Sequence, residues 1–131
     1  MPDSGQLVRD WFAHGNDDLR TAQVSLPAGG PPGTAAFLLQ QAAEKYLKGY
    51  LISKGWRLRK THNLITLLEE VIKYDTSFSD FMELGRRLSA YYMESRYPAD
   101  APTIYSEEEI AGVLAQTENL IAKIVKASGV I

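Results

Sequence analysis

The sequence predicts an all-α protein: an antiparallel up-and-down four-helix bundle with one additional short helix. Apolar residues recur at three- and four-residue spacing along most of the 131-residue chain, which is the period of an amphipathic α-helix. No segment alternates apolar and polar residues over a useful length, and no Asn-Gly hairpin turn is present. Segments rich in proline and glycine divide the chain into five helical stretches.

The first helix is expected over residues 5–26. Gly15 lowers the helix propensity by about 1 kcal/mol relative to alanine, so a bend or a close contact is expected there. Residues 27–33 contain three prolines and three glycines, and we expect them to form a flexible loop. The apolar stripe of this first helix consists of Leu7, Trp11, Leu19, Ala22 and Leu26.

The second helix is expected from Thr34, its N-cap, to about Lys54, with Gly55 as the stop signal. Its apolar face is wide, which is expected when a helix is buried on more than one side, by the bundle and by a second subunit. The members of that face are Ala35, Leu38, Leu39, Ala42, Ala43, Tyr46, Leu47, Tyr50 and Leu51.

A short third helix is expected with Thr61 as its cap and His62 in its first turn. The fourth helix should begin near Ser77 or Ser79 and end before Pro98. The apolar positions of these two helices are Leu64, Leu67, Leu68 and Val71, followed by Phe81, Leu84, Leu88, Tyr91 and Tyr92.

After a proline-containing loop, Ser106 to Glu109 form a capping box with acidic residues at the positive end of the helix dipole. The final helix that follows should be roughly 33 Å long at 1.5 Å per residue. Its apolar positions are Ile110, Val113, Leu114, Thr117, Ile121, Ile124 and Val125.

Composition excludes several kinds of chemistry. The chain has no cysteine, which removes disulfides, zinc–thiolate sites and cysteine nucleophiles and favours a cytoplasmic location. With His14 and His62 as the only histidines, and no glutamate followed three positions later by histidine, neither a metal nor a cofactor is expected. The longest apolar run has five residues and no signal-peptide pattern is present, so no membrane association is expected.

Basic residues gather between positions 44 and 62, although the net charge is −2. A solvated surface is the plainer interpretation, and an anion site for a nucleotide phosphate or an RNA backbone, with tyrosines stacking on bases, is the alternative. On the second helix, Gln41, Glu44, Lys45 and Lys48 form one polar ridge. A Glu44–Lys48 pair within the helix would contribute only a few tenths of a kcal/mol. The basic residues are Lys45, Lys48, Lys54, Arg57, Arg59 and Lys60.

Three motifs follow one another along the chain: Gln40-Gln41-Ala42-Ala43-Glu44-Lys45-Tyr46-Leu47-Lys48, then Thr61-His62-Asn63-Leu64, then Ser95-Arg96-Tyr97-Pro98. In this order they resemble the HEPN domain (higher eukaryotes and prokaryotes nucleotide-binding). The resemblance covers nearly the whole chain, so residues 1–131 are interpreted as a single HEPN-like domain. It implies a helical bundle that usually dimerises and places positively charged residues at a shared groove.

The resemblance also bears on activity. Many HEPN relatives are RNases of toxin–antitoxin or defence systems, others are partners of a small nucleotidyltransferase, and others are proposed to bind nucleotides. The RNases carry an Arg followed, after four to six residues, by a His. Arg96 matches that Arg, but Ala101, Pro102 and Thr103 stand where the His is required. The chain is therefore not expected to be an enzyme.

Three functional interpretations follow. The first is a non-catalytic module that binds the phosphate of a nucleotide or nucleic acid through Lys45, Lys48, His62, Arg96 and Tyr97. The second is a metal-independent RNase that uses Arg96 with a displaced His62 as its catalytic pair. The third is a structural subunit that pairs with itself, as a homodimer, or with a minimal nucleotidyltransferase in a toxin–antitoxin-type system.

Overall fold

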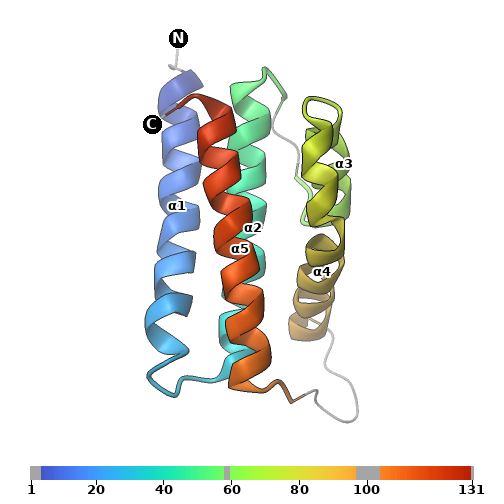
Figure 1. Ribbon diagram of the computed structural model, residues 1–131. Coiled ribbons are helices and arrows are strands. Elements are labelled where there is room, and N and C mark those ends of the chain that lie inside the picture. Colours follow the sequence, from blue (N-terminus) through green and yellow to red (C-terminus); the bar gives the residue numbers. More distant parts are fainter. Residues whose placement is uncertain (1–3, 58–59, 97–103, 131) are drawn as a thin grey trace.

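The computed structural model describes residues 4–57, 60–96 and 104–130, apart from the side chain of residue 96. Within these ranges the chain is all-helical, without a strand, as the sequence predicts (Figure 1). None of the described helices is long and apolar enough to cross a membrane. The elements are α1 (Ser4–Ser25), α2 (Pro32–Ser53), α3 (Leu64–Ile72), the 3₁₀-helix η1 (Thr76–Phe81), α4 (Met82–Arg96) and α5 (Glu107–Ser128).

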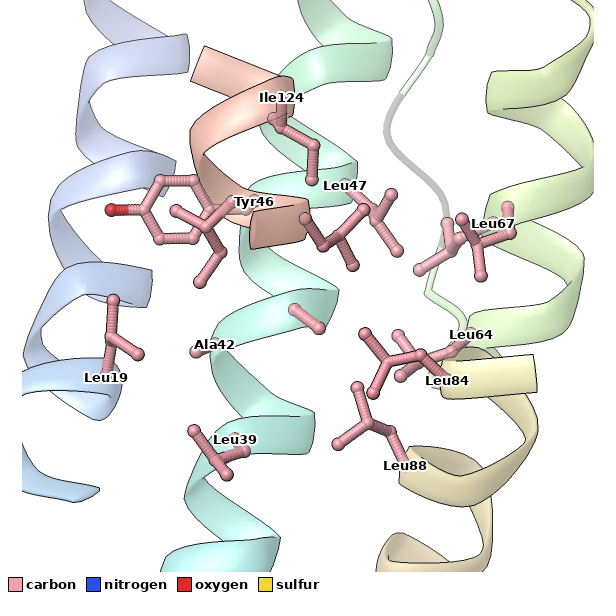
Figure 2. Close-up of a cluster of buried hydrophobic side chains, with 14 of the residues drawn as sticks. Leu19, Leu39, Ala42, Tyr46, Leu47, Leu64, Leu67, Leu84, Leu88 and Ile124 are labelled. Carbon is pink, nitrogen blue, oxygen red and sulfur yellow. The ribbon is translucent and has the colours of Figure 1, made fainter. Parts of the chain in front are cut away.

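Helix α2 is the centre of the bundle and packs against each of the other α-helices. In Figure 1, α1 lies on one side of α2 and α3 with α4 on the other, while α5 runs alongside α1 and α2. Figure 2 shows how Leu39 and Leu47 of α2 lie between Leu19 of α1 and Leu84 of α4. All four of these leucines are buried.

The bundle itself accounts for the wide apolar face of α2. Fourteen of its 22 residues are buried, and these include polar as well as apolar side chains. Since α1, α3, α4 and α5 all cover this helix, its apolar width is no argument for a second subunit.

The ends of the helices follow capping chemistry, with two corrections to the sequence analysis. Helix α2 begins after Pro31, and proline occupies its first position, where the missing N–H is not needed; Thr34 therefore lies inside the first turn. Helix α3 is capped by Asn63, whose Oδ1 accepts hydrogen bonds from the N–H groups of Ile65 (3.0 Å) and Thr66 (3.2 Å). The predicted cap of α5 is confirmed, since Ser106 Oγ accepts from the Glu109 N–H at 3.0 Å.

The segment before α4 is a 3₁₀-helix, so the predicted start near Ser77 or Ser79 is too early. Asp75 caps η1 by accepting hydrogen bonds from the N–H of Ser77 at 3.0 Å and from its hydroxyl at 2.6 Å. The turn places Phe78 in the core, fully buried against the ring of Tyr50 at 5.4 Å between centroids. Helix α4 begins at Met82, directly after this turn.

The buried stripe of α1 differs from the predicted one at its N-terminal end. Leu7 is 40% exposed, whereas Val8 and Phe12 are buried. The ring of Phe12 stacks on Tyr46 of α2 with 5.0 Å between centroids. Trp11 is partly buried at the edge of this contact.

Gly15 marks a close approach of α1 to α2, as its position in the sequence predicts. A Cβ atom at Gly15 would lie 2.7 Å from Cδ2 of Tyr46 and 3.3 Å from the carbonyl oxygen of Ala42. Tyr46 is itself buried, so its ring has little room to move. The glycine therefore permits the packing of these two helices.

Two Gly→Ala substitutions should have opposite effects. Gly15→Ala should lower the free energy of unfolding by about 1–3 kcal/mol, because the added methyl group overpacks the α1–α2 contact. Gly112 in α5 is the matched control, since nothing lies within 4 Å of a Cβ at that position. Gly112→Ala should raise stability by about 0.5–1 kcal/mol through helix propensity. Urea denaturation measures both, and a Gly15→Ala protein as stable as the wild type would contradict the close approach.

Candidate functional site

A buried carboxylate lies at the centre of the polar residues on α2. Glu44 is 4% exposed. Its Oε2 accepts a hydrogen bond from Nζ of Lys48 at 3.1 Å, and its Oε1 lies 2.9 Å from Nδ1 of His62. Gln40, also fully buried, donates to the same Oε1 at 3.3 Å. One buried carboxylate thus contacts three polar side chains, those of Lys48, His62 and Gln40.

Lys48 is also buried, with 4% exposure. Besides its ion pair with Glu44, its ammonium lies 5.6 Å from the centroid of the Trp11 ring, a cation–π contact with α1. The spacing alone predicts an intrahelical Glu44–Lys48 pair that contributes a few tenths of a kcal/mol. Burial changes that magnitude, because removing one partner leaves an unpaired charge in the interior, at a cost of about 3–5 kcal/mol.

His62 lies at the surface end of this polar cluster. Because Asn63 is the cap of α3, His62 precedes the helix and is not in its first turn, contrary to the prediction. Its side chain is 55% exposed, and its ring stacks on Tyr92 of α4 at 5.2 Å between centroids, with 20° between the planes. The imidazole is therefore held by α2 on one side and by α4 on another.

A hollow of about 270 Å³ opens beside this histidine, between the start of α3 and the last turns of α4. Ile65 and the half-exposed Met93 form apolar parts of its wall. Ser89 also lines it. The hydroxyl oxygen of Ser89 is buried and has no hydrogen-bond partner in the part of the chain that the structure describes. The complete lining is His62, Asn63, Ile65, Ser89, Tyr92 and Met93.

Lys45 lies on the other side of α2 and has its own partner. Its Nζ is 2.6 Å from Oδ2 of Asp18 in α1. It lines a second hollow, of about 350 Å³, together with residues of α1 that include Asp10 and His14. The structure thus gives Lys45 and Lys48 one carboxylate partner each and associates Lys45 with α1.

The two remaining candidates are at and beyond the end of α4. Arg96 is the last residue of α4 and follows Tyr92 by four positions, which is about one helical turn. The ring contact between His62 and Tyr92 places the segment before α3 next to the last turns of α4. Tyr97, the side chain of Arg96 and the basic residue Arg59 lie outside the described residues.

The charges on α2 cancel locally. The side chains of Glu44 and Lys48 form one ion pair, and those of Asp18 and Lys45 form another. An anion at the hollow would therefore not find free positive charge on these two lysines. In the described ranges, no group of three or more His, Cys, Asp and Glu side chains could hold a metal ion.

Sequence reasoning missed the roles of three residues. Glu44 belongs to the polar ridge of the second helix, but its position in the sequence does not show whether the side chain is exposed or buried. Tyr92 was assigned to the core, whereas it is partly exposed and supports His62. Ser89 has no distinguishing feature in the sequence, because the burial of its hydroxyl appears only in the folded structure.

Comparison with known proteins identifies the fold. The HEPN domain model matches residues 8–128. The crystal structure of TT1696 from Thermus thermophilus is similar with a TM-score of 0.76 and 29% identity, covering 92% of this chain and 97% of that one. The crystal structure of ST0689, an archaeal HEPN homologue, is similar with a TM-score of 0.75, 27% identity and the same coverage, 92% and 97%. The search of curated proteins gave no significant match.

The buried ion pair predicts a strong dependence on both partners. Lys48→Met alone should lower the free energy of unfolding by about 3–5 kcal/mol, because Glu44 would stay buried without its counter-charge. Glu44→Leu combined with Lys48→Met should restore most of that loss. Lys45→Met is the control on the same helix, since its pair with Asp18 is more exposed, and should cost about 1 kcal/mol or less. Equal losses for Lys48→Met and Lys45→Met in urea denaturation would contradict the distinction.

Proposed function

This chain belongs to the HEPN domain family, and we propose that within it the protein is a non-catalytic module that binds the phosphate of a nucleotide or nucleic acid. We place the binding site at the hollow beside His62, next to the end of α4. The observation that carries the proposal is the stack of His62 on Tyr92, one turn before Arg96. An imidazole, an aromatic face and an arginine position thus meet at one edge of the bundle.

The residues proposed to contact the ligand are fewer than the sequence analysis expects. His62, Arg96 and Tyr97 remain in the proposed set, since a guanidinium forms paired hydrogen bonds with phosphate oxygens. Lys45 and Lys48 are engaged by Asp18 and Glu44, so we propose that they support the site without touching the anion.

A non-catalytic role follows from what cleavage requires. Metal-independent RNA cleavage needs a base near the 2′-hydroxyl and a group that stabilises the charge developing on the phosphate. Arg96 stands at the position of the family's Arg and would serve the second need. The His of the RNase motif is replaced, since residues 101–103 are Ala-Pro-Thr.

An RNase remains the second candidate function because one observation favours it. The segment of His62 is connected to α4 through Tyr92, so a displaced histidine would stand near the position of Arg96. Incubation of purified protein with RNA tests this directly. Cleavage that is lost in both Arg96→Ala and His62→Ala would replace the binding-module proposal, and we expect the RNA to stay intact.

The family also supports proposals on partners. We propose a homodimer, and a small nucleotidyltransferase as the second partner in a toxin–antitoxin-type system in the cytoplasm. The basis is the resemblance of the three motifs to the family. The wide apolar face of α2 does not add to it, because the other helices of the bundle cover that face. A neighbouring reading frame that encodes such a nucleotidyltransferase would support the second partner.

Ligand binding should appear as thermal stabilisation. A mono-, di- or triphosphate nucleotide or a short RNA at 100 times its Kd should add about 2.7 kcal/mol, which is several degrees in Tm for a domain of this size. Arg96→Ala and His62→Ala should each remove most of this shift while the unliganded Tm stays near that of the wild type.

Arg86→Ala is the matched control, because Arg86 is an exposed arginine on the same helix, paired with Glu83 at 3.1 Å. It removes the same charge at a residue that does not line the hollow and stands ten positions before Arg96, about 15 Å along the helix, so it should leave the shift unchanged. A shift that Arg86→Ala reduces as much as Arg96→Ala would indicate general charge attraction, and no shift with any ligand would reject the phosphate site.

The oligomeric state is tested separately. Light scattering at micromolar concentration should give twice the mass of the 131-residue chain. Because the described surface carries no argument for the dimer beyond family resemblance, a monomer at that concentration would reject the homodimer and leave the ligand site untouched.

A further inference from the structure

We infer that Glu44 is the positioning residue of His62: its carboxylate holds the imidazole as the Nδ1–H tautomer and leaves Nε2 free beside the hollow between α3 and α4. The contact between Glu44 Oε1 and His62 Nδ1, at 2.9 Å, carries the inference. The role of this contact in ligand binding rests on the function proposed above, whereas the assignment of the tautomer does not.

The ionised state of Glu44 follows from its surroundings. Lys48 lies 3.1 Å away, and both side chains are almost completely buried, at 5% and 6% exposure. A neutral Glu44 would leave the ammonium of Lys48 in the interior without a counter-charge, which is strongly unfavourable. The carboxylate is therefore charged and acts only as a hydrogen-bond acceptor.

The proton position on His62 follows from the charge of Glu44. A carboxylate that only accepts requires a donor at Nδ1, so in neutral His62 the proton resides on Nδ1 and Nε2 carries the lone pair. Gln40 strengthens the arrangement, because its Nε2 donates to Glu44 Oε1 at 3.3 Å and reaches the backbone oxygen of His62 at 3.5 Å. The backbone and the ring of His62 are thus both connected to α2.

Tyr92 fixes the remaining freedom of the ring. The stack, with 20° between planes, restricts rotation of the imidazole about its hydrogen bond to Glu44. Nε2 is separated from Nδ1 by Cε1 and takes no part in the contact with Glu44, and the side chain is 55% exposed. A neutral His62 therefore presents a hydrogen-bond acceptor to a ligand, and a protonated His62 presents a donor to a phosphate oxygen.

The tautomer can be read directly from the full chain without ligand. Long-range ¹H–¹⁵N NMR at about pH 8, where an ordinary histidine is neutral, distinguishes a protonated ring nitrogen from one with a free lone pair. We expect His62 to be protonated at Nδ1, the opposite of the preference of a free side chain. His14 is an exposed histidine of α1 and provides the internal reference for the ordinary pattern. A His62 spectrum with the pattern of His14 would overturn the inference.

A pair of double variants separates positioning from stability. Glu44→Leu with Lys48→Met removes the acceptor and its counter-charge together, and His62 should then lose its Nδ1–H preference and adopt the pattern of His14. Asp18→Asn with Lys45→Met removes the neighbouring ion pair of α2 and should leave the tautomer of His62 unchanged. Retention of the Nδ1–H form without Glu44 would overturn the positioning role; if the first variant does not fold, the wild-type spectrum decides.

The outcome is distinguishable from failure of the proposed function. An Nδ1–H tautomer in a protein that binds no phosphate or nucleotide would support the role of Glu44 and reject the ligand site. A protein that binds nucleotide through His62 but shows the ordinary tautomer would support the ligand site and reject the role of Glu44.

Discussion

The ion pair between Glu44 and Lys48 is the interaction on which the candidate site depends. Helix α2 is covered by all the other α-helices, so a charge on its inner side must be paired. Lys48 also contacts the Trp11 ring of α1, and Glu44 also contacts His62, which precedes α3. One buried contact therefore connects the two sides of the bundle and determines where the histidine lies.

The same burial limits what the basic residues can do. Lys45 and Lys48 belong to the predicted phosphate-binding set, yet each has a carboxylate partner within hydrogen-bond distance, at 2.6 and 3.1 Å. A phosphate would therefore need positive charge from other residues, and we propose that Arg96 and protonated His62 supply it. The Tyr92 stack at the end of α4 then provides the geometric reason to place a ligand at this edge rather than along α2.

Much of the fold and several candidate site residues can be predicted from local patterns, but the contacts that arrange the site cannot. Leu64, Leu67, Leu68 and Val71 are all fully buried, as their spacing predicts. The α1 register is harder, because an apolar stripe centred on Leu7 or on Val8 satisfies the same period. The Thr61 cap fails for a similar reason, since Asn63 is a capping residue two positions later. The role of Glu44 depends on burial by distant segments, which spacing within one helix does not encode.

The most direct test of the account is a backbone amide NMR titration of the full chain with a nucleoside diphosphate. The predicted result is a set of shifts confined to residues 62–65 and 89–97, the proposed ligand site, while the hollow that contains Lys45 and His14 is unaffected. Shifts centred on Lys45 and residues 10–14 would contradict the account, because they would place the anion where Asp18 already neutralises the lysine.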